Sequence, residues 1–227
     1  MGLSTSKVSE GGGGTPKVIQ AGQPVFKIHS VELSQAPWME KDKAYSIMMQ
    51  CESRKPEEGF VGFKKDVNDE SKGNYDGPVG RIKTSNWPYK DGTTKSGIEV
   101  SRDTDIMIAI NRICKAVGST WMQDVDNKYD TIEELVEGFN KDKPFKDKFV
   151  KATVACREYA RPGNEYPGQD LYLAKGKKGF VVLEGEGTTP SKLLPYNEAD
   201  HYSHYVPEET DSFAGDEVAD DTPEFDV

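Results

Sequence analysis

The sequence predicts a mainly β domain with a helical insert, between a flexible N-terminal arm and a disordered acidic C-terminal tail. Apolar residues alternate with polar ones on both sides of a region in which they recur at helical spacing. Hydrophobic residues are 35% of the 227 residues, below the roughly 45–50% of globular domains. Part of the chain is therefore expected outside a core, and the glycine-rich start and acidic end are the obvious parts.

The arm comprises residues 1–23 and contains the run Gly11 to Gly14, a composition that behaves as a flexible coil. A long strand follows from Val25 to Leu33. Phe26 and Ile28 share one face of it, and the apolar alternation then shifts by one residue. Such a slip within a strand indicates a bulge or a sharp bend.

Two more strands are expected before the insert. Alternating apolar residues predict a second strand from Tyr45 to Cys51. A short apolar run predicts a third strand from Phe60 to Phe63. The polar, glycine-rich stretch 66–80 predicts a loop, and residues 79–83 predict another extended segment.

Two helices form the insert. Ser101 is a suitable N-cap for a helix over residues 101–118, in which apolar residues recur at helical spacing until Gly118. Thr131-Ile132-Glu133-Glu134 is a capping box and predicts a helix over residues 131–140.

After the insert, strands are predicted over 148–159 and 171–173, with a further edge strand over 179–183. This order predicts an OB-fold over residues 24–184, a five-stranded, partly open barrel. A bent first strand fits because a small barrel needs a corner to close. A β-sandwich is the alternative, but it has no natural place for two consecutive helices.

Charge separates the body of the chain from its end. Residues 1–197 hold all 29 bases and 28 of the 39 acids, which gives a formal charge of +1. Residues 198–227 hold eleven acids and no base, which gives −11, so the overall charge of −10 describes neither part. A block of like charge with few apolar residues is typical of a disordered interaction tail, here predicted over residues 185–227.

Nothing in the sequence supports catalysis, a cofactor or a metal site. P-loop, nucleophile-elbow and Cys-x-x-Cys motifs are absent. His201 and His204 have no further ligands at suitable spacing. Residues 124–130 begin like a calcium loop, but Lys128 replaces an oxygen ligand, Tyr129 the required Gly and Leu135 the closing Glu. Three scattered cysteines do not make a disulfide scaffold, no signal peptide is visible, and no apolar run approaches the ~20 residues that cross a bilayer. We expect a protein that is not an enzyme and does not enter a membrane.

Aromatic residues interleaved with bases give the strongest functional signal. Cations follow the phosphates of a single strand, and flat rings stack on its bases at roughly 1–3 kcal/mol per base. Core packing is the alternative for every ring, but turn-like neighbours favour ligand contact for Trp87, Tyr89 and Trp38, whereas Trp121 is expected in the core. The predicted DNA-binding residues are Trp38, Tyr75, Arg81, Lys83, Trp87, Tyr89, Lys90, Arg157, Tyr159, Arg161, Tyr172 and Lys175.

The tail is expected to have two roles, although a tail that serves only solubility is the alternative. With a reach of about 30 Å, this polyanion would compete with DNA for a basic groove on its own domain. Near its end, the aromatic ring of Phe225 is flanked by acidic residues and follows a proline, a combination that suits docking into a pocket on a partner protein. The expected partner-binding residues are Asp220, Asp221, Pro223 and Phe225.

Several stretches also carry a family resemblance. They are the glycine-rich N-terminus running into Thr15-Pro16-Lys17-Val18-Ile19-Gln20, then Asp69-Glu70-Ser71-Lys72-Gly73, Asp91-Gly92-Thr93-Thr94-Lys95-Ser96-Gly97-Ile98 and Glu158-Tyr159. They resemble the single-stranded DNA-binding proteins of tailed phages, most closely those of crAss-like phages, over roughly residues 1–175. The resemblance implies an OB-fold, a role in phage DNA replication, recombination or repair, and the cytoplasm of an infected bacterial host.

The chain end is similar to the acidic tips of bacterial single-stranded DNA-binding proteins, in which two Asp precede Pro and a terminal Phe. Here Glu224 separates Pro223 from Phe225, and Asp226-Val227 follow the ring. This departure leaves the identity of a docking partner open.

The sequence as a whole predicts sequence-independent binding and protection of single-stranded DNA, with replication or recombination proteins recruited by the tail. An OB-fold module that binds proteins or glycans, for example in a virion, is the alternative. It predicts no salt-dependent DNA affinity and buried rings. A nuclease would need carboxylates clustered around a divalent ion, which the spacing does not offer. Formation of a homo-oligomer is compatible with this prediction.

Overall fold

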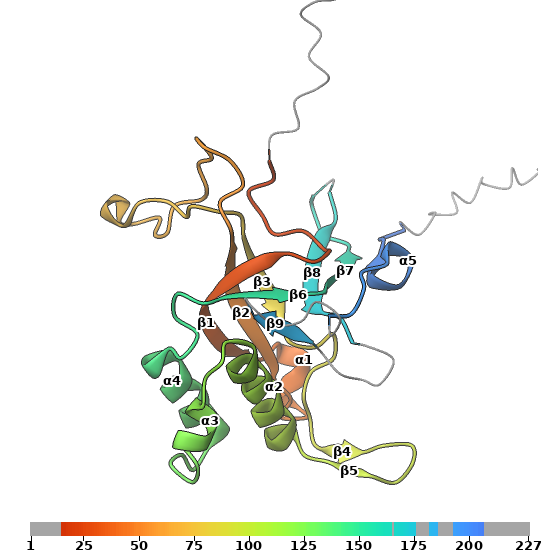
Figure 1. Cartoon of the computed structure of the whole chain (residues 1–227). Helices are drawn as coiled ribbons and strands as arrows, with labels where there is room; N and C mark the ends of the chain where they lie inside the picture. The colour runs from red at the N-terminus through yellow and green to blue at the C-terminus, as the bar shows by residue number, and fades with distance from the viewer. Residues whose placement is uncertain (1–14, 165, 176–181, 186–192, 207–227) are drawn as a thin grey trace, which may run out of the picture.

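The computed structural model describes residues 15–164, 166–175, 182–185 and 193–206, and is mainly β with a curled main sheet (Figure 1). The strands of this sheet are β1 Val25–Ser34, β2 Ser46–Ser53, β3 Val79–Lys83, β6 Phe149–Ala152, β7 Val154–Tyr159, β8 Gly168–Leu173, β9 Leu183–Gly185 and β10 Tyr202–Ser203. Their order is β10-β7-β8-β3-β2-β1-β6-β9. Within the described residues the main sheet therefore has eight strands, where five were expected.

β1 and β2 form the long antiparallel pair at the centre of the sheet. The register of β1 against β2 shifts between Ile28 and Ser30, which confirms the bend expected from the apolar pattern. The shift lets Phe26 and Val31 both point into the core, where neither is exposed to solvent.

The third strand differs from the prediction. Residues 60–63 are not a strand, and β3 over residues 79–83 pairs with β2 instead. Next to residues 60–63, Lys64 and Asn74 form one isolated antiparallel bridge, in which the Tyr75 N–H donates to the Phe63 carbonyl at 2.9 Å and the Lys65 N–H to the Gly73 carbonyl at 3.0 Å. Val61 and Phe63 lie exposed in a loop over residues 54–78, which also holds the 3-10 helix η2 Glu70–Lys72. A short apolar run therefore marked a loop rather than a core strand.

The long strand expected over residues 148–159 is broken at a single residue, Thr153. Its first part, β6, pairs with β1, and its second part, β7, pairs with β8. β8 in turn runs parallel to β3. One extended segment therefore links both sides of the curled sheet, and its break accounts for one of the additional strands.

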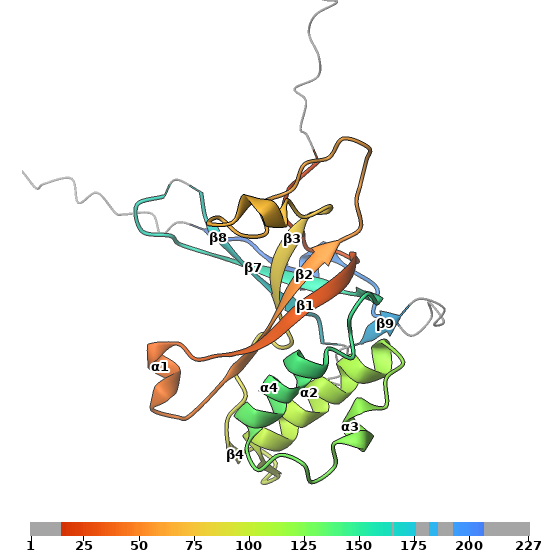
Figure 2. The ribbon, with the colours of Figure 1, turned by 90° about the vertical axis from the view of Figure 1, so that its left-hand side faces the viewer.

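The helices lie together at one end of the sheet (Figure 2). They are α2 Arg102–Ala116, α3 Trp121–Asp124 and α4 Ile132–Asp142, whereas α1 Pro37–Glu40 lies in the β1–β2 connection. Ser101 and Thr131 accept hydrogen bonds from backbone N–H groups of the first turns of α2 and α4, which confirms both predicted caps. Isoleucines of α2 and Phe139 of α4 join the strands in one core.

A two-stranded hairpin, β4 Gly92–Thr93 with β5 Glu99–Val100, projects away from the main sheet (Figure 1). It directly precedes α2. None of the helices in the described part of the chain is both long and apolar enough to cross a membrane.

The described parts of the two flanking segments are joined to the sheet, contrary to expectation. Residues 15–23, assigned to the flexible arm, include one bridge from Val18 to Val79 and another from Gly22 to Val154. Residues 193–206, assigned to the disordered tail, include α5 Glu198–His201 and β10, which pairs with β7. Backbone hydrogen bonds to the sheet hold both segments, and composition does not reveal such bonds. Of the edge strand expected over residues 179–183, only the end is described, where β9 begins.

Candidate functional site

The predicted DNA-binding residues of β3, β7 and β8 share the face of the sheet that points away from the core. Lys83 lies opposite Tyr172, and Asp170 lies opposite Arg157. Directly paired residues point to the same side of a sheet, and the intervening Ile82 and Leu171 are buried on the other side. We call this the sheet face, made of Arg81, Lys83, Arg157, Tyr159, Asp170 and Tyr172.

Acidic partners neutralise part of the charge on the sheet face. Asp170 Oδ2 lies 2.5 Å from Lys83 Nζ and 3.7 Å from Arg157 Nη2. Arg81 Nη2 lies 2.8 Å from Glu32 Oε2, and both of these side chains are exposed. Because exposed ion pairs contribute little to stability, a phosphate could replace Glu32 at low cost. The three cations, Arg81, Lys83 and Arg157, together with the two carboxylates, Glu32 and Asp170, give this group a formal net charge of +1.

The two tyrosines of the sheet face differ in exposure. Tyr159 is 48% exposed, and its ring lies against Gly168, where a Cβ would come within 2.4 Å of Tyr159 Cζ. Gly168 thus lets the ring lie close on β8 while part of it stays open to a ligand. Tyr172 is half-buried, and burial raises the pKa of its hydroxyl. Tyr159 is therefore the more accessible stacking surface of the two.

A pocket lies where the chain leaves β3 and β8. Its volume is about 270 Å³. Residues 85–94 form most of its wall, and Val100, Asp105 and Lys175 complete it from distant parts of the sequence. We call this the Trp87 pocket. The fold thus brings Lys175 to three predicted residues that are close together in the sequence, namely Trp87, Tyr89 and Lys90.

The loop that carries Trp38 is tied to the segment that carries Trp87. Lys90 Nζ lies 3.2 Å from Asp42 Oδ2, and Tyr45 and Tyr89 exchange two backbone hydrogen bonds. Trp38 and Trp87 are each 67% exposed. Tryptophan is highly buried on average, so two such rings on linked loops indicate a binding surface.

Three predicted residues have other surroundings. Tyr89 lines the pocket but also packs against the core, and its hydroxyl lies 2.8 Å from Thr84 Oγ1. Tyr75 lies beside the ring of His29, with 5.5 Å between centroids, in the loop between β2 and β3. Arg161 is exposed in the β7–β8 turn, beyond the last residue of β7. Trp121, expected in the core, is buried there, and its Nε1 donates to Asp142 at 2.8 Å.

The last described residues are anchored on β7 through Glu158, whose side chain points to the side of the strand opposite the sheet face. The Tyr202 hydroxyl donates to Glu158 Oε1 at 2.7 Å, and the Tyr205 N–H donates to Glu158 Oε2 at 3.1 Å. These hydrogen bonds hold the pKa of Glu158 below its ordinary value. β10 runs parallel to β7, so the chain heads toward the end of β7 that carries Tyr159. The expected partner-binding residues 220, 221, 223 and 225 lie outside the described residues.

Sequence reasoning missed the acidic residues of the site. Asp170 and Asp105 lie among ordinary surface charges, and their neighbours in the sequence give no sign of what they face. Only the pairing of Asp170 with β7, and the approach of α2 to residues 85–94, place them beside the predicted cations and rings. Within the described ranges, no group of three or more His, Cys, Asp or Glu is placed to hold a metal ion.

Comparison of the chain with protein-family models, with curated proteins and with solved structures finds no match to any of them. The sheet face, the two exposed tryptophans and the Trp87 pocket are therefore the features of this chain that bear on its function.

Proposed function

We propose that this protein binds single-stranded DNA without strong sequence preference, through the sheet face and the two tryptophan loops. The observation that carries the proposal is the pair of 67% exposed indoles, Trp38 and Trp87, on loops joined by the Lys90–Asp42 ion pair. Rings that stack on bases, beside cations that follow phosphates, are what this kind of binding requires.

An OB-fold is part of the same proposal. The strand pairing supports it. β1, β2 and β3 are consecutive antiparallel strands, and β3 pairs in parallel with β8. Residues 149–159 then close the sheet, because β6 pairs with β1 and β7 pairs with β8. Helices between β3 and β6 are also consistent with this fold. OB-folds bind oligonucleotides on strands 2–3 and on the loops after strands 1 and 4. The first of these loops corresponds here to residues 35–45, which include Trp38.

We further propose a role in phage DNA replication, recombination or repair inside an infected bacterium, as the family resemblance implies. The tail would recruit partner proteins and compete with DNA. The pairing of β10 with β7 supports competition, because β7 also carries Arg157 and Tyr159 of the sheet face and nine acids follow residue 206 in the sequence. A module that binds only proteins or glycans would not need exposed stacking rings next to cations, so we rank it second.

The test is a fluorescence-anisotropy titration of a labelled ~30-nucleotide poly-dT strand, with a duplex as control, at two salt concentrations. We expect binding to the single strand that weakens with salt at a log–log slope near −0.7 per phosphate neutralised. Trp87→Ala should weaken binding several-fold, whereas Lys146→Ala, which changes an exposed lysine outside both surfaces, should not. Absence of binding at low salt would refute the proposal.

A further inference from the structure

The size of the Trp87 pocket suits a single ring system. Its volume of about 270 Å³ lies just below the roughly 300–1,000 Å³ of sites for drug-sized ligands. Much of the indole remains solvent-exposed, so a flat ligand can enter and stack on it. A nucleobase that has left the stack of a bound strand has this shape.

The charges around the pocket also favour a base over a phosphate. Lys90 and Lys175 contribute two positive charges, while Asp91 and Asp105 contribute two negative ones. A wall of zero net charge offers little attraction to a phosphate group, which favours sites with an excess of cations. Asp91 is already engaged, because its Oδ1 accepts a hydrogen bond from the Arg102 N–H at 2.8 Å.

Asp105 has a different place in the pocket. It lies in the first turn of α2, and it lines the pocket from this helix rather than from the loop that carries Trp87. An ionised carboxylate can only accept hydrogen bonds. Cytosine presents an N4 amino group as a donor, whereas thymine presents the O4 acceptor at the same position. A carboxylate next to a stacked base therefore distinguishes the two bases by their hydrogen-bonding groups.

We propose that the Trp87 pocket holds one base of the bound strand, and that Asp105 makes it prefer a base with an exocyclic amino group, such as cytosine, over thymine. This inference rests on the proposed function. It adds a specificity-determining residue and a modest base preference to a surface that otherwise tolerates any sequence. A sequence-tolerant stacking surface is compatible with a small preference of this kind.

The experiment compares labelled dC and dT oligomers of about 15 nucleotides, within the range of about 4–16 nucleotides covered by one OB-fold. The full-length chain should bind dC about fivefold more tightly than dT, or about 1 kcal/mol, the low end for one base contact. Asp105→Asn should bring this ratio close to one, because an amide can donate to thymine O4. Asp103→Asn removes the same charge from the same helical turn but outside the pocket, so it should leave the ratio unchanged.

The quantity compared between variants is the ratio of the dC and dT affinities, and both are measured on the same protein sample. A loss of folded protein therefore affects both affinities equally and leaves their ratio unchanged. Equal affinities of the full-length chain for dC and dT would overturn the pocket assignment and leave the proposed function intact. A dC preference that survives Asp105→Asn would also overturn it, whereas absence of binding to either oligomer would refute the proposed function itself.

Discussion

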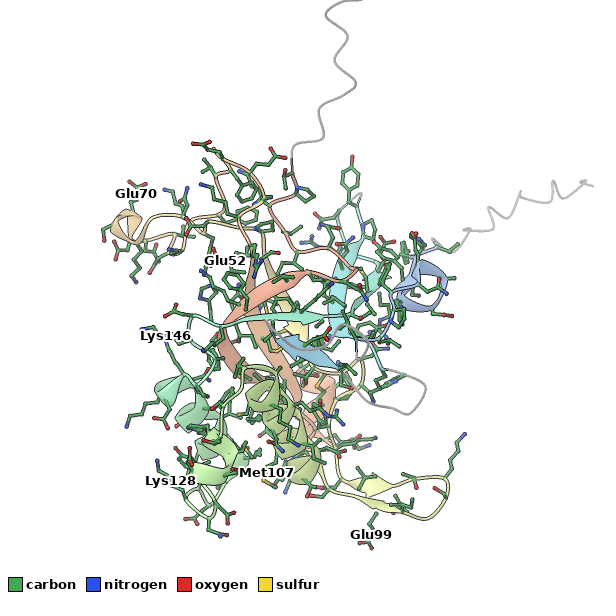
Figure 3. The ribbon with its side chains drawn as sticks, viewed as in Figure 1. Glu52, Glu70, Glu99, Met107, Lys128 and Lys146 are labelled. Atoms are coloured by element: carbon green, nitrogen blue, oxygen red, sulfur yellow. The ribbon has the colours of Figure 1, made fainter. Side chains whose placement is uncertain are left out.

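Glu52 is a buried charge whose two oxygens are both bonded, and it joins β2 to the loop over residues 54–78. Its Oε2 lies 2.7 Å from His29 Nε2 and 3.0 Å from Lys27 Nζ. Its Oε1 accepts hydrogen bonds from the N–H groups of Asp76 and Gly77. The side chain is only 2% exposed, and Figure 3 shows it where this loop meets the sheet. These partners compensate the removal of the charge from water, as burial of a charge requires.

We predict that Glu52→Gln lowers the free energy of unfolding by about 1.5–3 kcal/mol, the range for hydrogen bonds to charged groups. Urea denaturation measures the change. Glu70→Gln is the matched control, because Glu70 is 83% exposed and pairs with the exposed Lys64, so its loss should cost less than about 1 kcal/mol. Equal effects of the two substitutions would contradict the assigned role of Glu52.

The contribution of Glu52 should depend on pH. Burial raises the pKa of this carboxyl, but hydrogen bonds from Lys27, His29 and the Asp76 N–H outweigh burial and leave the pKa below its ordinary 4.5. A lowered pKa in the folded state stabilises the protein fully above 4.5, and this stabilisation is lost as the pH falls through the folded-state pKa. The difference in urea midpoint between the native chain and Glu52→Gln should therefore shrink below pH 4.5. A difference that grows on acidification would contradict the assignment.

Asp170 holds two cations of the sheet face. We predict that Asp170→Asn tightens single-stranded DNA binding several-fold, because Lys83 and Arg157 then become available to phosphates. The log–log salt slope should steepen by about 0.7 for each additional phosphate that these cations neutralise. Asp126→Asn, which removes an exposed charge outside the sheet face, serves as the control in the same anisotropy assay. Weaker binding by Asp170→Asn would place the phosphates elsewhere.

At the scale of elements, residues 15–23 connect β3 to β7, two strands that are separated by β8 in the sheet. Ile19 donates to the Val79 carbonyl, and Gly22 exchanges two hydrogen bonds with Val154. The Ile19 side chain is 3% exposed and packs on Gly80, where a Cβ would lie 3.0 Å from Ile19 Cβ. The segment thus fills part of the open side of the curled sheet.

We predict that Ile19→Ala lowers the free energy of unfolding by about 2–5 kcal/mol, the usual range for truncating a buried isoleucine. Val18→Ala, at a neighbouring side chain that is 43% exposed, should change it by less than about 0.5 kcal/mol. Chemical denaturation of both variants tests the difference. A small effect of Ile19→Ala would mean that the segment rests on the sheet without stabilising it.

At the scale of the whole molecule, charge separates into a near-neutral body and a strongly acidic end, and the fold determines where that end starts. Residues after 206 carry nine acids and no base. We predict that deleting residues 207–227 tightens single-stranded DNA binding and leaves the thermal midpoint unchanged, because α5 and β10 remain on β7. Unchanged affinity would refute competition by the tail but not DNA binding itself.

Elements whose cause is local were predictable. Ser101 and Thr131 cap α2 and α4 with their own hydroxyls, and the phase slip in β1 marks its bulge. Long-range pairing was not predictable to the same degree. The apolar run at 60–63 predicted a third strand, but β3 over residues 79–83 pairs with β2 instead. Whether a segment becomes a strand depends on the neighbouring strand with which its backbone can form hydrogen bonds, and a short apolar run does not reveal that neighbour.

The candidate site shows the same limit. The residue types, cations interleaved with rings, followed from the sequence, but their exposure did not. Trp87 and Tyr89 are two residues apart in one turn, yet one indole is open to solvent while the tyrosine packs on the core. The sequence by itself determined the local elements, the segregated charge and the kind of chemistry available. Tertiary structure alone decided which rings and cations share one surface, because solvent exposure and charge pairing depend on neighbours that the fold brings from distant positions.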